Sequence, residues 1–231
     1  MFRRTWKSQL SPSGVQRGAV LFLLYLLVFP RLNGWLQSLF MRGSAGEELV
    51  AEANVIYYIF LFMLCLFAFW SFLKKDMEGL VDWLPENFYG VVAFLAGSAV
   101  LTLILRKLPF PVRDPIPLQY AQEYALAPGA TLVLILVLIP LVEEIMFRGF
   151  LYGQLREYSR PGAAVIVTVG YAFFQVWRYA WDFGDPRYLL LTVLYLPMSA
   201  GLTLCYENGG SVWACVVMHG AFNGLTFLVG P

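Results

Sequence analysis

The chain has 231 residues, of which 59% are hydrophobic and only 13% are charged. Soluble domains carry about 25% charged residues, so this composition excludes an ordinary soluble protein and predicts a membrane protein with several spans. The net charge of +1 argues against a nucleic-acid partner.

Apolar segments recur along the chain, and a membrane-spanning helix needs about 20 such residues. The first segment, 18–30, is short, so we expect it to belong to a longer helix that is kinked near Pro30 and anchors the chain. Further spans are predicted at 55–73, 88–105, 130–153, 162–181, 188–206 and 209–231. The pattern predicts an all-α, polytopic transmembrane helical bundle of seven spans, or eight if 35–41 forms its own short membrane helix.

Basic residues in the short loops predict the orientation, because cytoplasmic loops carry an excess of Lys and Arg. On the predicted cytoplasmic side lie Arg3, Arg4, Lys7 and Arg17 before the first span, and Lys74, Lys75, Arg156 and Arg160 later in the chain. We therefore expect a cytoplasmic N-terminus, although Arg106, Lys107 and Arg113 break the pattern.

No internal repeat and no separate soluble domain are apparent, so the whole chain, 1–231, is predicted to be a single membrane domain. Its first part, 1–128, would hold the N-terminal spans and end in a loop at 107–128. That loop contains five prolines and mixed charges and is expected to lie at the membrane interface. The second part, 129–231, carries the polar motifs.

Two adjacent glutamates, Glu143 and Glu144, lie in the apolar segment 130–153 and are followed by Arg148. Ionisable residues inside a span are costly to retain and therefore indicate function. Glu144 and Arg148 are four residues apart and can pair on one helix face, whereas Glu143 lies about 100° around the helix. The spacing predicts that Arg148 neutralises Glu144 and that Glu143 faces a cavity. The alternative is that Glu144 and Arg148 form a purely structural ion pair and that Glu143 has no chemical role.

His219 and Asn223 are also four residues apart and share a helix face. Both can donate hydrogen bonds, and together they could bind a developing oxyanion. The alternative is a pair that joins neighbouring helices. Gly220 and Gly224 form a GxxxG pair on an adjacent face, which predicts that another helix approaches closely.

A third polar site lies in the segment 162–181, where Tyr171 and Gln175 share a face. Taken alone, Gln175 favours a hydrogen bond between helices over a catalytic group. The aromatic residues that follow it fit a belt at the membrane interface.

In this order, the three polar segments resemble the CPBP family of intramembrane proteases, also called the Abi or CAAX-protease family, whose founding activity is that of the Ras-converting prenyl endopeptidase. The family shows EExxxR, FxxxH and HxxxN or HxxxB motifs, each on a membrane helix. The stretch "EEIMFR" matches the first motif with Glu143, Glu144 and Arg148, and "HGAFN" matches the third with His219 and Asn223. The resemblance covers 130–225 and marks 129–231 as the CPBP-like catalytic core.

The middle motif departs from the family pattern. In the family's register, Tyr171 and Gln175 stand in place of the phenylalanine and the histidine, and shifting the frame does not restore them. The resemblance implies catalytic positions at Glu143 as general base, at Gln175 in the slot of the missing histidine, and at His219 and Asn223 as the oxyanion hole. It also implies that Glu144, Arg148 and Tyr171 hold the site in shape.

The resemblance thus implies a glutamate-type intramembrane endopeptidase that cleaves a peptide or membrane-protein substrate, prenylated in the founding activity, and that is slowed or inactivated by Gln175. The alternative is a non-catalytic relative with an immunity or binding role that retains the polar core for packing. A transporter ranks third, because no pair of broken helices flanks a midplane site.

Residues that could hold a metal ion are few. His219 is the single histidine, and the three cysteines, Cys65, Cys205 and Cys215, lie in apolar runs without CxxC spacing. Zinc catalysis usually takes two or three His or Cys ligands. We therefore expect no metal or other cofactor and interpret the cysteines as small packing residues.

Overall fold

The computed structural model describes residues 10–40 and 50–230. Within these residues every regular element is a helix, so the all-α prediction is confirmed. Some residues used to predict spans and orientation, namely Arg3, Arg4, Lys7, Met41 and Pro231, lie outside the described residues.

The chain begins with a broken helix. Helix α1 (Pro12–Leu27) and helix α2 (Phe29–Phe40) meet at a bend of 47°. Pro30 lies in the first turn of α2, where its missing N–H is tolerated, whereas it could not continue α1. The predicted kink near Pro30 is therefore confirmed, and α3 (Val50–Asp82) runs back alongside α1.

Helices α4 (Leu84–Leu105) and α5 (Pro115–Leu126) follow. The predicted interfacial loop thus contains a helix, which begins at Pro115 and is capped by Asp114. The Asp114 carboxylate accepts a hydrogen bond from the Ile116 backbone N–H at 3.1 Å and one from the Tyr195 hydroxyl at 2.7 Å. These bonds cap α5 and fasten it to the C-terminal half of the bundle.

One long helical run, 128–158, crosses the centre of the molecule and contains two π-helical segments. It consists of α6 (Pro128–Val133), η1 (Leu134–Leu138), α7 (Ile139–Glu144), η2 (Ile145–Tyr152) and α8 (Gly153–Tyr158), of which η1 and η2 are π-helical. Short π-helical turns are rare and often mark functional sites. Both glutamates of the first motif lie between the two π segments.

The C-terminal elements are α9 (Arg160–Asp182), the short η3 (Pro186–Leu191), α10 (Thr192–Gly209) and α11 (Val212–Val229). The start of α11 is held by Asp76 of α3, which is buried. Its carboxylate accepts hydrogen bonds from the Ser211 hydroxyl at 2.9 Å and the Val212 N–H at 2.8 Å. This cap fixes the helix that carries His219.

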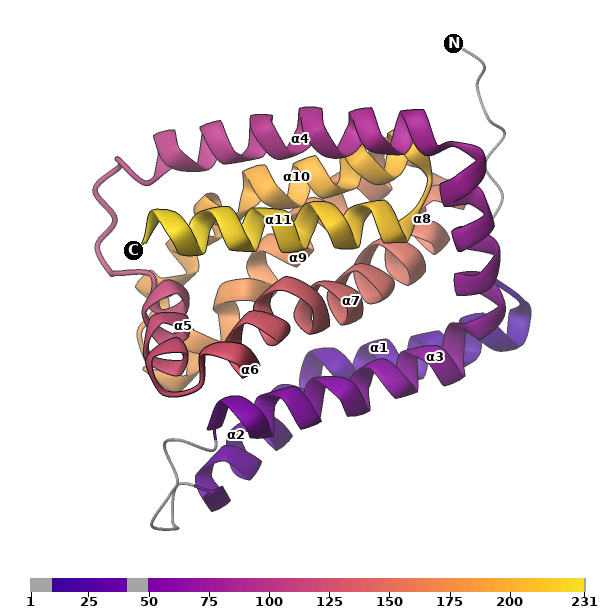
Figure 1. Ribbon diagram of the computed structural model, residues 1–231. Helices are drawn as coiled ribbons and strands as arrows, with labels where there is room; N and C mark the ends of the chain where they lie inside the picture. Colours follow the sequence, from indigo (N-terminus) through magenta and orange to yellow (C-terminus); the bar gives the residue numbers. More distant parts are fainter. Residues whose placement is uncertain (1–9, 41–49, 231) are drawn as a thin grey trace.

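The helices form one bundle (Figure 1). Helices α4, α10 and α11 pack together on one side, α1 and α3 pair on the other, and α7 lies between α11 and α3. The three cysteines, Cys65, Cys205 and Cys215, are free and buried in the core, which confirms their interpretation as packing residues.

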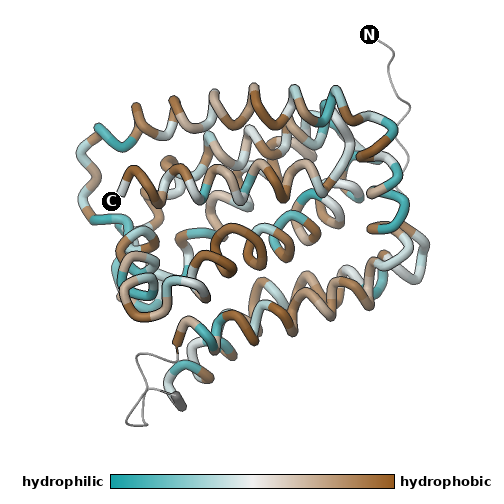
Figure 2. The backbone as a smooth tube through the Cα atoms, viewed as in Figure 1, coloured by the Kyte–Doolittle hydropathy of each residue, from teal (hydrophilic) through white to brown (hydrophobic). Residues whose placement is uncertain are grey.

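Hydrophobic residues also cover the outside of the bundle, as Figure 2 shows along α3 and α4. Exposed large apolar side chains on these two helices include Ile56, Phe60, Phe67, Val92, Val100 and Ile104. Large exposed apolar patches are rare on soluble monomers. The outer surface is therefore suited to lipid, as expected for an integral membrane protein.

The number of spans differs from the sequence prediction. Among residues 10–40 and 50–230, five helices are long and apolar enough to cross a membrane, or six if the bent α1–α2 pair forms one span, rather than seven or eight. Helix α9, predicted as the span 162–181, is not among them. Helix α9 is long enough, but polar residues such as Gln175 and Arg178 lower its mean hydropathy below that of the five candidate spans.

Candidate active site

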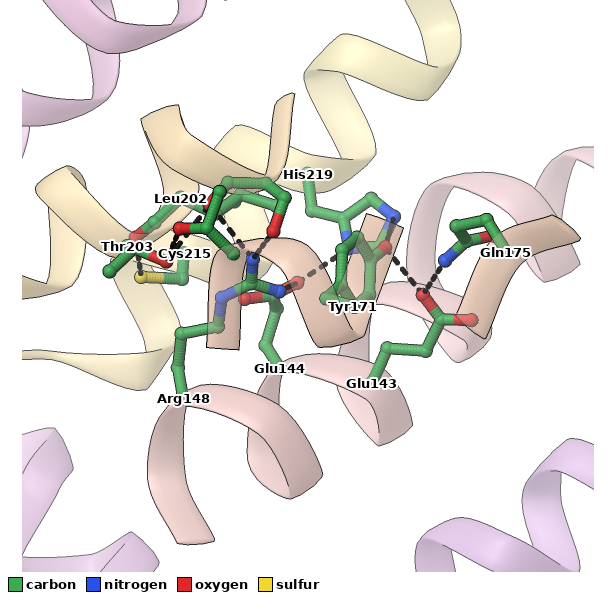
Figure 3. Close-up of polar contacts among 11 residues, drawn as sticks. Glu143, Glu144, Arg148, Tyr171, Gln175, Leu202, Thr203, Cys215 and His219 are labelled. Atoms are coloured by element: carbon green, nitrogen blue, oxygen red, sulfur yellow. Dashed lines mark hydrogen bonds and ion pairs between the residues drawn. The ribbon is translucent and has the colours of Figure 1, made fainter. Parts of the chain in front are cut away.

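The three polar segments meet inside the bundle (Figure 3). Glu143 and Glu144 come from α7, Tyr171 from α9 and His219 from α11, and all four side chains are buried. Sequence positions 76 residues apart, from Glu143 to His219, are thus brought to one place by the packing of α7, α9 and α11.

Glu144 and Arg148 form the predicted ion pair, with a distance of 3.0 Å between Arg148 Nη1 and Glu144 Oε1 and no exposure of either side chain. Arg148 Nη2 also donates to the backbone carbonyl and to the hydroxyl of Ser199, both at 3.1 Å. The guanidinium lies 4.3 Å from the centroid of the Tyr171 ring. This pair is confirmed, and Arg148 ties η2 to α9 and α10.

Glu143 is held by a different set of partners. Its Oε2 accepts a hydrogen bond from the Tyr171 hydroxyl at 2.6 Å and another from Gln175 Nε2 at 3.0 Å. Glu143 and Gln175 both line a cavity of about 120 Å³. The prediction that Glu143 faces a cavity while Glu144 is neutralised by arginine is therefore confirmed. Both bonds end on Oε2, so neither of these donors occupies Oε1.

His219 is bound on the other side of Tyr171. Its Nδ1 lies 2.8 Å from Glu144 Oε1, and its Nε2 lies 3.5 Å from the Tyr171 hydroxyl. Tyr171 therefore contacts both Glu143 and His219 through a single oxygen. The sequence predicted that this tyrosine helps to hold the site in shape; the geometry places it between the two groups.

Asn223 does not line the Glu143 cavity, although the resemblance places it in the oxyanion hole beside Glu143. Its Nδ2 donates to the backbone carbonyl of Ile135 at 2.8 Å, and its side chain lines a neighbouring cavity of about 70 Å³. In the described residues, neither Asn223 nor His219 lines the Glu143 cavity.

The π register of η1 explains the position of Asn223. The Ile139 N–H bonds to the Leu134 carbonyl, five residues back. The next bond in this register would join residue 140 to Ile135, but Pro140 has no N–H. The Ile135 carbonyl is therefore left without its helical donor, and a buried carbonyl needs one. Asn223 supplies it.

The glycines of the GxxxG pair let α11 approach the same segment. A methyl group at Gly220 would lie 2.2 Å from the Leu136 carbonyl oxygen, and one at Gly224 would lie 3.2 Å from the Leu136 side chain. The predicted close helix approach is thus confirmed, and α11 packs directly on the π-helical turn.

The remaining cavity wall includes residues that the sequence analysis did not single out. Tyr25, Asn54, Gln119 and Glu123 come from helices α1, α3 and α5. Asn54 immediately precedes a predicted span and Glu123 lies in the predicted interfacial loop, so neither gave the signal of a charge inside an apolar run. Within the described residues, no three His, Cys, Asp or Glu side chains come together as a metal site needs.

The helices that carry the motifs also match a known protein family. Residues 126–225 match the Rce1-like family of type II CAAX prenyl endopeptidases. The match runs from the end of α5 into α11 and includes every motif residue, which confirms the resemblance seen in the sequence. No curated protein and no solved structure matches the chain. The Rce1-like region thus contains the motif residues of the site, and helices α1, α2, α3 and α5 add cavity walls from outside it.

Proposed function

We propose that this protein is an intramembrane endopeptidase of the CAAX-processing class, in which Glu143 activates a water molecule to attack a peptide bond. The match to Rce1-like peptidases supports a membrane protease. The observation that carries the catalytic assignment is that Glu143 is fixed through Oε2 while it lines a cavity of about 120 Å³. One water molecule needs about 10–15 Å³ on this scale, so the cavity has room for water.

The reaction divides into two proton transfers. In the first, a Glu143 oxygen accepts a proton from water while the water oxygen bonds to the substrate carbonyl carbon, whose oxygen becomes an oxyanion. In the second, the carbonyl re-forms, the C–N bond breaks and the protonated Glu143 gives its proton to the leaving amine. Tyr171 and Gln175 hold the carboxylate in position for both steps.

Oxyanion stabilisation is assigned to His219 and Asn223, as the family motif implies. Preorganised donors aimed at the oxyanion provide a large part of such catalysis. For Asn223 this role requires its amide to turn from the Ile135 carbonyl toward the substrate. For His219 it requires Nε2 to carry a proton as well as Nδ1, which is bound to Glu144, and the ring to reach past Tyr171.

The substrate is assigned as a peptide or a segment of a membrane protein, and a prenyl group on it would share the lipid phase with the bundle. The catalysis needs no metal or other cofactor, since Glu143 itself supplies the base. The orientation is assigned with the N-terminus in the cytoplasm, from the basic residues of the loops. No role for nucleic acid follows from any of these features.

Quenched peptides with and without a farnesylated cysteine would test the proposal on the purified, detergent-solubilised chain. We expect slow cleavage that Glu143→Ala abolishes. Glu52→Gln is the matched control, because Glu52 is exposed and does not line the cavity. Cleavage that persists in Glu143→Ala would contradict the assignment of the base.

A non-catalytic relative remains the second candidate because of one specific contact. The Gln175 amide donates to Glu143 at 3.0 Å and so satisfies the carboxylate with a group that cannot take part in proton transfer. This arrangement would suit a polar core kept for packing. Background cleavage by both the unmodified chain and its Gln175→His variant would support this candidate.

A further inference from the structure

The cavity that contains Glu143 also contains a second carboxylate, Glu123 of α5. We propose that Glu123 forms a separate subsite that binds the cationic side chain of a lysine or arginine in the bound peptide. This inference rests on the proposed function only in taking the ligand to be a peptide. It does not require that the peptide is cleaved.

A chain of amide groups is oriented toward Glu123. Its Oε1 accepts hydrogen bonds from Gln119 Nε2 at 2.9 Å and from Asn54 Nδ2 at 3.3 Å. The side-chain oxygen of Asn54 in turn accepts from Gln37 at 2.7 Å and Asn33 at 3.2 Å. Four amides from three helices therefore present their N–H groups in the direction of this carboxylate, which stabilises its negative charge.

The other oxygen of Glu123 is unused. The residue is only 6% exposed, and Oε2 has no hydrogen-bond partner among the described residues. A buried polar atom without a partner is costly, and such atoms are rare in folded proteins. An ionised carboxylate can only accept, so the missing partner is a donor. Burial raises the pKa of Glu123, whereas the hydrogen bonds from Gln119 and Asn54 lower it. A bound cation would therefore offset the cost of ionising this buried carboxyl group.

The charge of the cavity favours a cation over a neutral donor. Two carboxylates, Glu123 and Glu143, line it, and Arg178 is the one Lys or Arg on its wall within the described residues. Arg178 is already engaged, with its Nε 3.5 Å from an Asp182 carboxylate oxygen and its guanidinium 5.4 Å from the Tyr179 ring. The wall also contains Tyr57, Tyr58 and Trp177, which suit the aliphatic stem and the charge of a lysine or arginine.

The test uses fluorescein-labelled decapeptides, with one lysine placed at each position in turn and an acetyl-lysine peptide to match each one. Binding to the unmodified full chain in detergent is measured by fluorescence anisotropy, with cleavage followed separately. We expect at least one position where lysine lowers the Kd tenfold or more relative to acetyl-lysine. Glu123→Gln should remove this difference, and the charge-matched Glu52→Gln should retain it.

A second measurement needs no variant and so stands even if Glu123→Gln fails to fold. A photoreactive lysine analogue at the preferred position should cross-link to Glu123, Asn54 or Gln119, as located by mass spectrometry. Equal binding of lysine and acetyl-lysine at every position would overturn the proposal. A lysine preference that the folded Glu123→Gln variant retains would also overturn it, and so would cross-links to residues other than these three. Tight lysine binding with no cleavage by either the unmodified chain or its Gln175→His variant would refute only the peptidase function, and cleavage without lysine preference would refute only the subsite.

Discussion

His219 is bonded to Glu144 and not to Glu143, the glutamate that lines the cavity. Its Nδ1 lies 2.8 Å from Glu144 Oε1, the oxygen that also receives the Arg148 guanidinium. A carboxylate paired with arginine accepts hydrogen bonds, so the Nδ1 proton is fixed on this side. The remaining nitrogen, Nε2, faces the Tyr171 hydroxyl, whose own proton goes to Glu143. Tyr171 is therefore the link between the glutamate and the histidine.

We expect Tyr171→Phe to lower cleavage at least tenfold, because Glu143 then loses its 2.6 Å donor and its connection to His219. The aromatic ring would still lie over Arg148, so the loss of stability should be small, about 1 kcal/mol for one hydrogen bond. Peptide cleavage and melting temperature in detergent measure the two effects. Tyr158→Phe is the control, since Tyr158 is exposed. Unchanged cleavage in Tyr171→Phe would remove this tyrosine from the mechanism.

We expect Gln175→His to raise cleavage at least tenfold. A glutamine has no titratable proton near neutral pH, and losing an acid–base partner typically costs about 10²–10⁴ in rate. The new imidazole would stand where the amide now lies 3.0 Å from Glu143. Gln16→His controls for adding a histidine at an exposed position. Rapid cleavage by the unmodified chain would show instead that Glu143 needs no such partner.

Glu144→Ala and Arg148→Ala should each destabilise the protein more than Glu143→Ala does. Removing one member of a buried ion pair leaves the other charge unpaired, at a cost of about 3–5 kcal/mol. Arg148→Ala would also remove the hydrogen bonds to Ser199, and Glu144→Ala would remove the hydrogen bond to His219. Glu143 borders a cavity that can admit water. Melting temperatures in detergent compare the three variants, and equal or reversed losses would mean that the two glutamates are assigned the wrong way round.

The contact of α11 with the π-helical turn predicts that Gly220→Ala strongly destabilises the bundle. Its new methyl group would lie 2.2 Å from the Leu136 carbonyl oxygen, which is backbone and cannot rotate away. Overpacking of this kind costs about 1–3 kcal/mol or more. Gly170→Ala is the matched control, because nothing lies within 4 Å of its added methyl group. A helix-interior alanine there should stabilise by about 0.5–1 kcal/mol. Similar melting temperatures for both variants would contradict the close approach.

Local spacing was enough to predict one half of the site. The pair of Glu144 and Arg148 depends only on helical periodicity, and so does the separation of Glu143 from it. The family resemblance then placed His219 in the same cluster. These predictions needed no knowledge of how the helices pack.

The other half depends on tertiary structure and could not be predicted. Glu123 meets Asn54 across 69 sequence positions, and neither residue lies inside an apolar run where a charge would attract notice. The diversion of Asn223 depends on the π register before Pro140, since in an ordinary α-helix a different carbonyl would be left free. Periodicity arguments assume a regular helix and therefore miss such a site.

Asn223→Ala separates the two roles open to that side chain. In the structure its amide serves the Ile135 carbonyl at 2.8 Å, so its loss leaves a buried acceptor unpaired and should cost about 1–3 kcal/mol. If Asn223 also turns to bind the oxyanion, kcat should fall by about 10²–10³ with little change in KM.

We expect both losses, and we expect the second to be measurable in the Gln175→His background, where cleavage is faster. Thr226→Val serves as the control, because it removes a side-chain hydrogen bond within the same helix, to the Phe222 and Asn223 carbonyls, without touching η1. A lower melting temperature with an unchanged kcat of the folded protein would show that Asn223 only completes the broken hydrogen-bond pattern before Pro140. In that case His219, already bound to Glu144 and facing Tyr171, would be left as the sole motif donor for the oxyanion.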